Sequence, residues 1–532
     1  MNLIRSNRGN LVGILIIFLL FMGSIYARRD KLDLPPSSDF EWITHHTLIT
    51  CEIWDQAGGP QHFAFNPVYS YPGKGNKAIA AFGGVMDKKG DQYYVSYPPF
   101  AFIYAYYSTK LFGGPDVYSL RTNSLIIHFF CTLLLYLIIR KIGSVPPDKI
   151  SIAAIFGGFL YLFSTGTLWS HSILYFSDML VQLFVMLSIY LFVRLLKKDY
   201  KKSSLLMLAI GIGTFLGCYT EWLAVFWAFF SGLSLIILYL VKKESVFLKA
   251  FLIIGISSVL AVSLTLFQYS SIDGFDHLKE VSLQKYEQRS GYSQSPEDTI
   301  LFTVNDDESW DYLYAYFERN FGMVILLRTV FILLLLPILI WHRKKLVFTD
   351  HAWKILILFL LFLSIGLHYI LFFNFNAIHE FANLKTGFFF ILLISFIVLT
   401  IEQIVNKYAR ATLAMFVIFI GSVHALKDYR VYRELYSYDD FNFARIHSAE
   451  IINEYEDPDQ YVFVNVPTSA GYLYLAKRMM FPVNDLQQVK GFMGFFKVDE
   501  AQYFHHEGDT LKYLEEYQLM NDSLIVKNKI NF

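Results

Sequence analysis

Apolar runs close to twenty residues long recur along almost the whole of this 532-residue chain. A helix of about twenty apolar residues is long enough to cross the roughly 30 Å hydrocarbon core of a bilayer. The chain is 55% hydrophobic and only 17% charged, a composition that soluble globular proteins do not share. The sequence therefore predicts a polytopic α-helical membrane protein.

About eleven segments are predicted to span the membrane. The first resembles a signal peptide, but "YARRDK" follows it without a small-residue cleavage site, so we interpret it as an anchor. The predicted spans lie at about 11–27, 121–140, 150–168, 172–193, 204–219, 222–241, 248–270, 322–341, 353–373, 386–403 and 409–425.

The loops between these spans predict an orientation. On one side the loops are basic: "RKIGSVPPDK", "RLLKKDYKK", "KKESVFLK", "HRKKLVFTDHAWK" and "NKYAR". The connections "WSH" and "YTEW" on the other side contain no Lys or Arg, although Arg28, Arg29 and Lys31 after the first span disagree. Because Lys and Arg concentrate in cytoplasmic loops, we expect a cytoplasmic N-terminus and basic side.

This orientation divides the chain into two expected domains. Residues 1–426 form a membrane domain with external loops at 28–120, 271–321 and 374–385. Residues 427–532 form a small external α/β domain, since a helical pattern, a turn at Asp457–Pro458 and the strand "YVFVNV" follow one another.

Charge and cysteine content exclude several classes of protein. The net charge is zero, which gives no indication of a nucleic-acid partner. Three scattered cysteines make neither a disulfide framework nor a metal-binding pattern. His505 and His506 lack a third ligand at metal spacing, so we predict surface residues there. No cofactor is indicated; a divalent metal is compatible with the acids, but no spacing indicates one.

Titratable residues gather in "SDFEWITHHTLITCEIWDQAGG", residues 38–59 of the first loop. On a helical wheel His45 and Glu52 fall within about 40° of Glu41, whereas Asp39 and His46 point the other way. Two interpretations stay open. The stripe is either the solvated face of a juxtamembrane helix at the outer surface or a general base with its partners.

Other polar residues near the outer ends of spans carry the same two interpretations. Asp178 is expected about two turns inside its span, where an acid is costly and commonly functional. Glu221 and Ser170–His171 lie where a helix cap is as good an explanation as a ligand. The segment "DDESWDYLYAYFERN" (306–320) either binds an acceptor or forms a solvated amphipathic helix.

The short outer loop "NFNAIHEFANLKTGFF" brings His379, Glu380 and Lys385 within seven residues. One interpretation is a helix connection whose lysine reaches the interface. The other is a site that stabilises a departing phosphate, since a preorganised cation there lowers the barrier.

The segment "YYVSYPPFAFIYAYYSTKLFGGPDVYSLRT" starts an aromatic helix at Pro98–Pro99, ends it at Gly113–Gly114 and leads to Arg121. Together with "TEW" at 220–222 and "HEF" at 379–381, it resembles the GT-C superfamily of integral-membrane glycosyltransferases. That superfamily includes the protein O-mannosyltransferases and the lipid A aminoarabinose transferases. In pattern the resemblance covers nearly the whole chain.

The resemblance implies an inverting, acid–base assisted transfer of a sugar from a polyprenyl-phosphate donor to a glycan, lipid or protein acceptor. It implies the outer face of a bacterial inner membrane. The family's usual acidic pair is replaced by "DFEWITHH", and among its acids Glu41 ranks first as the base and Asp39 second. The implied site residues are Glu41, Asp39, His45 and Glu52 for catalysis; His379, Glu380, Lys385, Arg121 and His171 for the donor phosphate; and His46, Asp178, Glu221, Pro98 and Pro99 around the cavity.

Two other classes stay open on the sequence. An O-antigen-type polymerase or ligase typically depends on Arg and His in large late outer loops, whereas this chain concentrates its acids and histidines in the first loop. A lipid or glycan flippase or transporter generally needs charged or broken-helix sites near the midplane. Here the polar residues gather toward one surface.

Overall fold

The computed structural model describes residues 7–32, 40–77, 85–199, 203–291, 307–342, 348–435, 440–455, 457–508, 510–520 and 523–532. It divides into two compact units. The helical unit comprises Met1–Leu34, Leu120–Leu266 and Leu283–Leu435; the mixed unit comprises Pro35–Ser119, Phe267–Ser282 and Tyr436–Phe532. The first loop and the tail, predicted as parts of separate domains, fall in the same unit.

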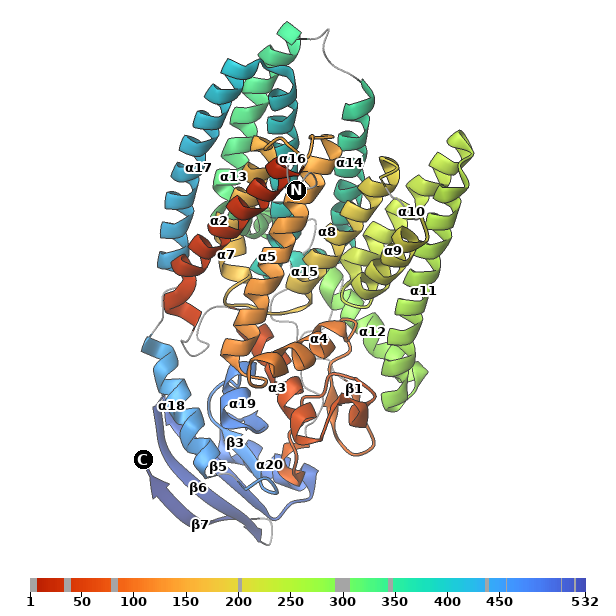
Figure 1. Cartoon of the computed structure of the whole chain (residues 1–532). Helices are drawn as coiled ribbons and strands as arrows, with labels where there is room; N and C mark the ends of the chain where they lie inside the picture. The colour runs from red at the N-terminus through yellow and green to blue at the C-terminus, as the bar shows by residue number, and fades with distance from the viewer. Residues whose placement is uncertain are drawn as a thin grey trace. The chain divides into compact units, whose positions relative to one another are not determined.

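Helices, most of them long, make up the helical unit (Figure 1), and a few of them extend beyond it. They are α2 (Arg8–Leu32), α5 (Val117–Ile142), α6 (Ile152–Phe163), α7 (Thr165–Ser170), α8 (Ser177–Leu196), α9 (Ser203–Cys218), α10 (Trp222–Lys242), α11 (Ser245–Asp273), α12 (Phe275–Ser290), α13 (Asp307–His342), α14 (Phe348–Leu371), α15 (Phe373–Ile378), η5 (Glu380–Asn383), α16 (Leu384–Ile404) and α17 (Lys407–Leu435).

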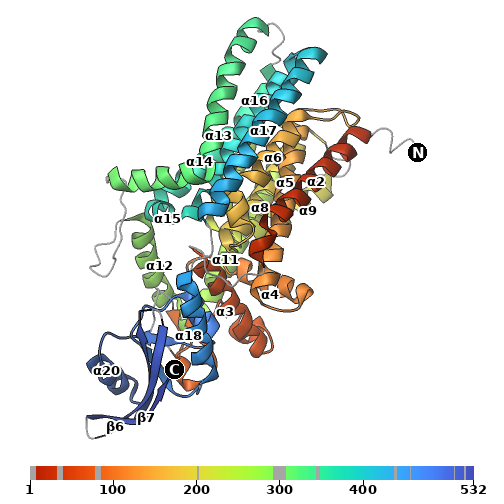
Figure 2. The ribbon, with the colours of Figure 1, turned by 90° about the vertical axis from the view of Figure 1, so that its left-hand side faces the viewer.

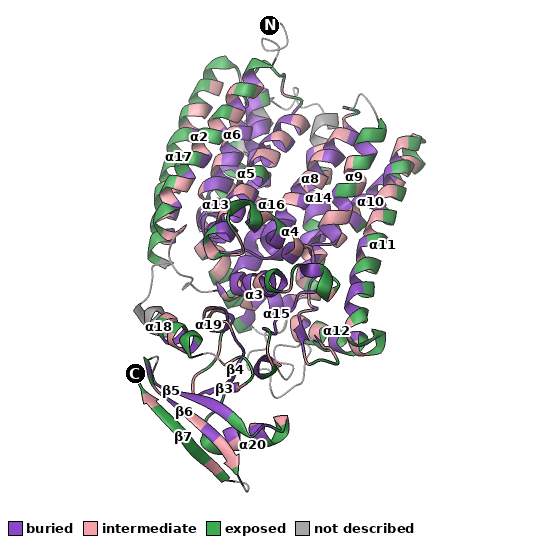
Figure 3. Cartoon of the chain, turned by 60° about the horizontal axis from the view of Figure 1, so that its bottom comes forward, coloured by how far each residue is buried: buried purple, intermediate pink, exposed green. Residues whose placement is uncertain are grey.

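Every predicted span overlaps a helix, although the bounds differ in places. Within the described residues, eight helices are long and apolar enough to cross a membrane, α6 and α9 are shorter apolar helices, and 322–341 lies in α13. Burial separates central helices from peripheral ones: 78% of the apolar window of α16 is buried, against 22% for α11 and α17 (Figure 3). The protein is an integral membrane protein.

The predicted span 150–168 is interrupted in the structure at Ser164. Ser164 is extended (φ −71°, ψ 140°), and its hydroxyl donates to the carbonyl of Leu160 at 2.6 Å. The next helix, α7, begins with the Thr165 amide donating to Asp428 of α17 at 2.9 Å. A distant carboxylate thus satisfies the amide that the break exposes, and the following span starts at Ser177 instead of near 172.

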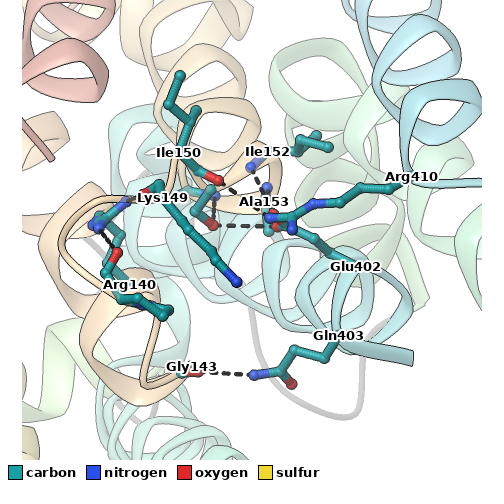
Figure 4. Close-up of polar contacts among 12 residues, drawn as sticks. Arg140, Gly143, Lys149, Ile150, Ile152, Ala153, Glu402, Gln403 and Arg410 are labelled. Atoms are coloured by element: carbon teal, nitrogen blue, oxygen red, sulfur yellow. Dashed lines mark hydrogen bonds and ion pairs between the residues drawn. The ribbon is translucent and has the colours of Figure 1, made fainter. Parts of the chain in front are cut away.

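A second carboxylate, near the end of α16, connects the start of α6 with the start of α17 (Figure 4). Glu402 of α16 accepts hydrogen bonds from the amides of Ile152 and Ala153 at 3.2 and 3.1 Å, at the start of α6. It also pairs with Arg410 of α17. An acid at a helix N-terminus satisfies otherwise unpaired amides and is favoured by the helix dipole.

The mixed unit combines the first loop with the tail. From the first loop come α3 (Trp42–Gln56), η1 (Pro60–Phe63), η2 (Lys74–Asn76), β1 (Val85–Met86), β2 (Gln92–Tyr93), α4 (Phe100–Thr109) and η3 (Lys110–Phe112). From the tail come α18 (Asp440–Glu454), β3 (Tyr461–Val464), α19 (Ala470–Ala476), β4 (Met480–Pro482), α20 (Leu486–Phe496), β5 (Glu500–Glu507), β6 (Thr510–Met520) and β7 (Ser523–Asn531).

A five-stranded sheet of order β4-β3-β5-β6-β7 organises the tail. β3 pairs in parallel with β4 and β5, and β5, β6 and β7 pair antiparallel. Val462, Phe463 and Phe504 are fully buried in it. The predicted order of helix, turn and strand in a small α/β domain is confirmed.

Candidate active site

Two buried carboxylates begin neighbouring helices of the helical unit. Asp178, 5% exposed, lies in the first turn of α8, and Glu221, 1% exposed, immediately precedes α10. Asp178 was expected two turns inside its span; it lies at the helix start because α8 begins only at Ser177. A carboxylate there benefits from the positive end of the helix dipole.

Glu221 does more than cap α10. One carboxylate oxygen accepts the Leu223 amide at 2.8 Å, and the other lies 3.0 Å from Nε2 of His368 in α14. Asn376 of α15 places Nδ2 3.3 Å from Nδ1 of His368, which fits a neutral ring that donates from Nε2 to Glu221. Burial raises the pKa of Glu221, and the positive charges of Lys385 and Arg289 oppose that rise.

Lys385 supplies a buried cation to the same neighbourhood. It is 3% exposed in the first turn of α16, and Nζ lies 5.2 Å from the ring centre of Tyr369. Its charge acts on both Asp178 and Glu221, yet it forms no ion pair with any residue that the structure describes. We call Asp178, Glu221, His368, Asn376 and Lys385 the carboxylate–lysine cluster.

Polar atoms near Asp178 in the chain are buried without a hydrogen bond to any described residue. They are Oδ2 of Asp178, Oγ of Ser177, Oγ of Ser170 and Nδ1 of His171. Since buried polar atoms in proteins are nearly always hydrogen-bonded, such atoms suit a polar ligand.

An apolar groove of about 520 Å³ opens between α13, α14 and α16. Its polar lining residues include Arg328 and also Tyr369, Asn383 and Thr386, which are hydrogen-bonded to one another through the Tyr369 hydroxyl at 2.9 and 3.0 Å. Lys385 directly precedes Thr386 and lies over the Tyr369 ring. The remaining lining is largely aromatic and aliphatic, including Trp310, Phe317, Phe362, Ile365, Phe389 and Phe390.

The other two residues of the predicted phosphate loop have different surroundings. His379 stacks on Phe381 at 5.2 Å, and its pKa falls to about 3 because the ring is shielded from water and lies near Arg289. The low pKa favours the neutral ring, and a role of His379 at the departing phosphate stays a prediction. Glu380 accepts hydrogen bonds from Arg319 at 2.7 Å and from Asn320 at 2.6 Å.

Arg319 and Asn320 belong to the predicted amphipathic helix at 306–320, which forms the first part of α13. Its Trp310 and Tyr314 are exposed. α13 is kinked at Phe321, directly after this segment, where the backbone leaves helical geometry (φ −138°, ψ 16°).

In the mixed unit the first loop forms the predicted helix as α3, with Glu41 at its N-cap. Glu41 is 2% exposed, so a solvated face does not describe it. The residue before it, Phe40, has a positive φ of 64°. Such a backbone is strained for a bulky residue, and strain of this kind concentrates at functional sites. Asp39 lies outside the described residues.

The rest of the stripe on α3 packs against α19 of the tail. Glu52 pairs with Lys477 at 2.7 Å and accepts the Tyr71 hydroxyl at 3.2 Å. His45 lies beside Gly471, where an added Cβ would come within 3.0 Å of its ring. Both side chains therefore contact the tail inside the mixed unit, and their catalytic role stays a prediction.

His46 faces another part of the first loop. Its Nδ1 lies 2.9 Å from the Tyr69 hydroxyl, and burial lowers its pKa to about 4.

The remaining predicted site residues lie at helix ends or contact other side chains. Arg121 donates to the carbonyls of Lys31 and Leu32 at 2.8 and 3.1 Å, which satisfies the C-terminal end of α2. Nε2 of His171 lies 3.2 Å from the Tyr161 hydroxyl, its ring stacks on that of His128, and burial lowers its pKa to about 3. Pro98 and Pro99 precede α4, as predicted.

The structure differs from the sequence predictions at two histidines. His506 was expected at the surface, but it is 3% exposed and bonded to Tyr472 at 2.6 Å, because alternate residues of β5 face opposite ways. His368 was not predicted at all. A histidine inside the apolar run "LHYIL" was the available signal, since ionisable residues in spans are rare and commonly functional.

Fold and site together define a polytopic integral membrane protein with a buried carboxylate–lysine cluster at one end of its helices. Its sequence matches no protein-family model and no curated protein. Its fold, however, matches solved structures. ArnT from Cupriavidus metallidurans bound to undecaprenyl phosphate aligns with a TM-score of 0.57 at 11% identity, over 93% of this chain and 92% of that chain.

The archaeal oligosaccharyltransferase AglB from Archaeoglobus fulgidus, in complex with an inhibitory peptide and a dolichol-phosphate, aligns with a TM-score of 0.54 at 11% identity. The alignment covers 92% of this chain and 69% of that chain. Both are GT-C superfamily membrane glycosyltransferases. The chain described here therefore has the GT-C fold.

Proposed function

We propose that this protein is a membrane glycosyltransferase that moves a sugar from a polyprenyl-phosphate donor to an acceptor hydroxyl. The observation that carries the proposal is the position of Lys385, a buried cation beside the polar lining residues Tyr369 and Thr386 of an apolar groove. A polyprenyl phosphate has the matching chemistry, an anionic head on a long apolar chain. The GT-C fold, shared with ArnT and AglB, supports the same function.

The proposed reaction is an inverting displacement. A carboxylate takes the proton of the acceptor hydroxyl, whose oxygen attacks the anomeric carbon from the face opposite the phosphate. The bond from that carbon to the phosphate oxygen breaks, and polyprenyl phosphate leaves with the electron pair. Lys385 stabilises the charge on the departing phosphate, and we keep Glu41 as the proposed base.

Within the carboxylate–lysine cluster, we propose that Glu221 and His368 hold the site in shape. The neutral His368 ring is bonded on both sides, to Glu221 and to Asn376. Asp178, whose Oδ2 has no hydrogen-bond partner among the described residues, is the carboxylate that we assign to the sugar hydroxyls. We also propose that the reaction takes place on the periplasmic face of a bacterial inner membrane, opposite the basic loops.

The test uses the purified full chain with a panel of sugars on short-chain polyprenyl phosphate, and measures the release of polyprenyl phosphate. We expect Lys385→Ala to lower turnover at saturating donor by about 10²–10³-fold. His379→Ala should cost less, because that ring is neutral. Lys249→Ala, which removes an exposed cation from α11, is the control. Full turnover by Lys385→Ala would contradict the proposal.

A further inference from the structure

A second apolar groove, of about 350 Å³, lies on the helical unit and is lined by α2, α6 and α17. Figure 2 shows α6 between the other two helices. Its walls include Leu20 of α2, Phe159 of α6 and Val417 of α17. At Gly421 an added Cβ would come within 3.2 Å of the Phe159 ring, so the glycine keeps the groove open. None of its lining residues belongs to the carboxylate–lysine cluster.

Cations lie at one end of this groove. Lys407 and Arg410 precede Ala414, a groove residue, by seven and four positions on α17, so all three share one helix face. Lys149 directly precedes Ile150, another groove residue. Arg8 begins α2 next to Gly9, whose added Cβ would meet the backbone of Lys149.

These positive charges outnumber the carboxylates beside them. Glu402 faces the amides at the start of α6 and pairs with Arg410, and Asp148 neighbours Lys149. Arg410 reaches from α17 to Glu402 and, at 3.2 Å, to the carbonyl of Ile150 (Figure 4). The exposed Lys149 forms no ion pair within the described part of the chain.

The length of the groove indicates what fits it. From Ile150 to Phe159 it follows nine residues, or about 14 Å at the rise of a helix. That is about half of the roughly 30 Å hydrocarbon core, the depth of one leaflet.

We propose that this groove is a binding site for a phospholipid with an anionic headgroup. One acyl chain lies between α2, α6 and α17, and the phosphate lies near Lys149, Lys407 and Arg410. The lipid comes from the leaflet on the side of the basic loops. The site is independent of the transfer reaction, because it lies on other residues.

Native mass spectrometry of the full chain, titrated with phosphatidylglycerol or with phosphatidylcholine of the same acyl chains, tests the site. We expect the protein to bind phosphatidylglycerol more tightly than phosphatidylcholine. Added phosphatidylcholine should not displace the bound phosphatidylglycerol. Lys149→Ala and Lys407→Ala should each weaken it about fivefold, since a cation near an anionic lipid contributes about 1 kcal/mol. Ala414→Trp should abolish it by filling the groove.

Lys249→Ala is the matched control, because it removes an exposed cation from α11, at the other side of the unit from α17 (Figures 1 and 3). It should bind phosphatidylglycerol like the wild type. Equal binding of the two lipids, or full binding by a folded Ala414→Trp variant, would overturn the proposal. The unfolding temperature of each variant shows whether it is folded.

Discussion

Three ionisable side chains of the carboxylate–lysine cluster, Asp178, Glu221 and Lys385, are at most 5% exposed among apolar helices. Burying an isolated charge costs several kcal/mol unless opposite charges or hydrogen bonds compensate. The cluster holds two acids and a lysine that act on one another, which offsets part of this cost. At this scale the sequence was informative, because charged residues are conspicuous in apolar runs; their partners were not visible.

The first prediction concerns the proposed base. Glu41→Gln should lower turnover by about 10²–10⁴-fold, because an amide cannot accept the acceptor's proton. Its unfolding temperature should stay near that of the wild type. Turnover of a lipid-linked sugar, measured beside thermal unfolding, checks both.

Glu52→Gln is the matched control, on the same helix with the same chemical change. It should lose the ion pair with Lys477 and some stability while keeping turnover. An active Glu41→Gln with an inactive Asp39→Asn would move the base to Asp39. Activity in both would mean that this loop holds no base.

A second prediction concerns His46 and pH. Its pKa is about 6.5 in the unfolded chain and about 4 in the folded protein, where burial favours the neutral ring. Between these values the unfolded chain binds more protons, so the stability contributed above pH 6.5 is lost as pH falls toward 4. The loss is about 3 kcal/mol.

His46→Gln should remove this part of the pH dependence while keeping an acceptor for Tyr69. Thermal unfolding of both proteins at pH 7 and at pH 4.5 measures it. The wild type should lose more stability between the two pH values than the variant; an equal loss would show that His46 does not contribute.

Among helices and strands, the predictable features are the local ones. Each span could be predicted because its apolar length is a property of one segment. The break at Ser164 could not, since Asp428, the residue that satisfies it, is 263 positions away from Thr165. For the same reason the sequence could show the stripe on α3 but not that α19 covers part of it.

The contact between α3 and α19 yields a prediction about stability. Gly471→Val should destabilise the protein by about 1–3 kcal/mol, because the added atoms would press on the His45 ring. Gly491→Val in α20 is the control, since an added Cβ there meets nothing within 4 Å. Chemical or thermal unfolding should show a lower stability for Gly471→Val than for Gly491→Val. Equal stabilities would show that α3 and α19 shift to make room for the added atoms.

At the scale of the whole molecule, both units join segments that are far apart in the chain. In the helical unit, α6 packs against α16 and α17. The mixed unit joins the first loop to the tail. Hydropathy could separate membrane segments from soluble ones, but it carries no information about which soluble segments pack together.

The proposed orientation has a direct test, because the native cysteines Cys51, Cys131 and Cys218 are all buried. In spheroplasts, a membrane-impermeant maleimide should label Lys512→Cys in the tail. It should label Lys249→Cys only after the membrane is opened. The reverse pattern would place the tail in the cytoplasm.

The ion pair between Glu52 and Lys477 joins residues 425 positions apart, and Met479 donates to Asn76 across 403. At about 5–20 residues per second, the ribosome needs about 20–80 s to make the chain between them. During that time α3 has no α19 to cover His45 and Glu52. The order of synthesis thus leaves this face of α3 uncovered, and accessible to proteases and chaperones, until the end of the chain emerges.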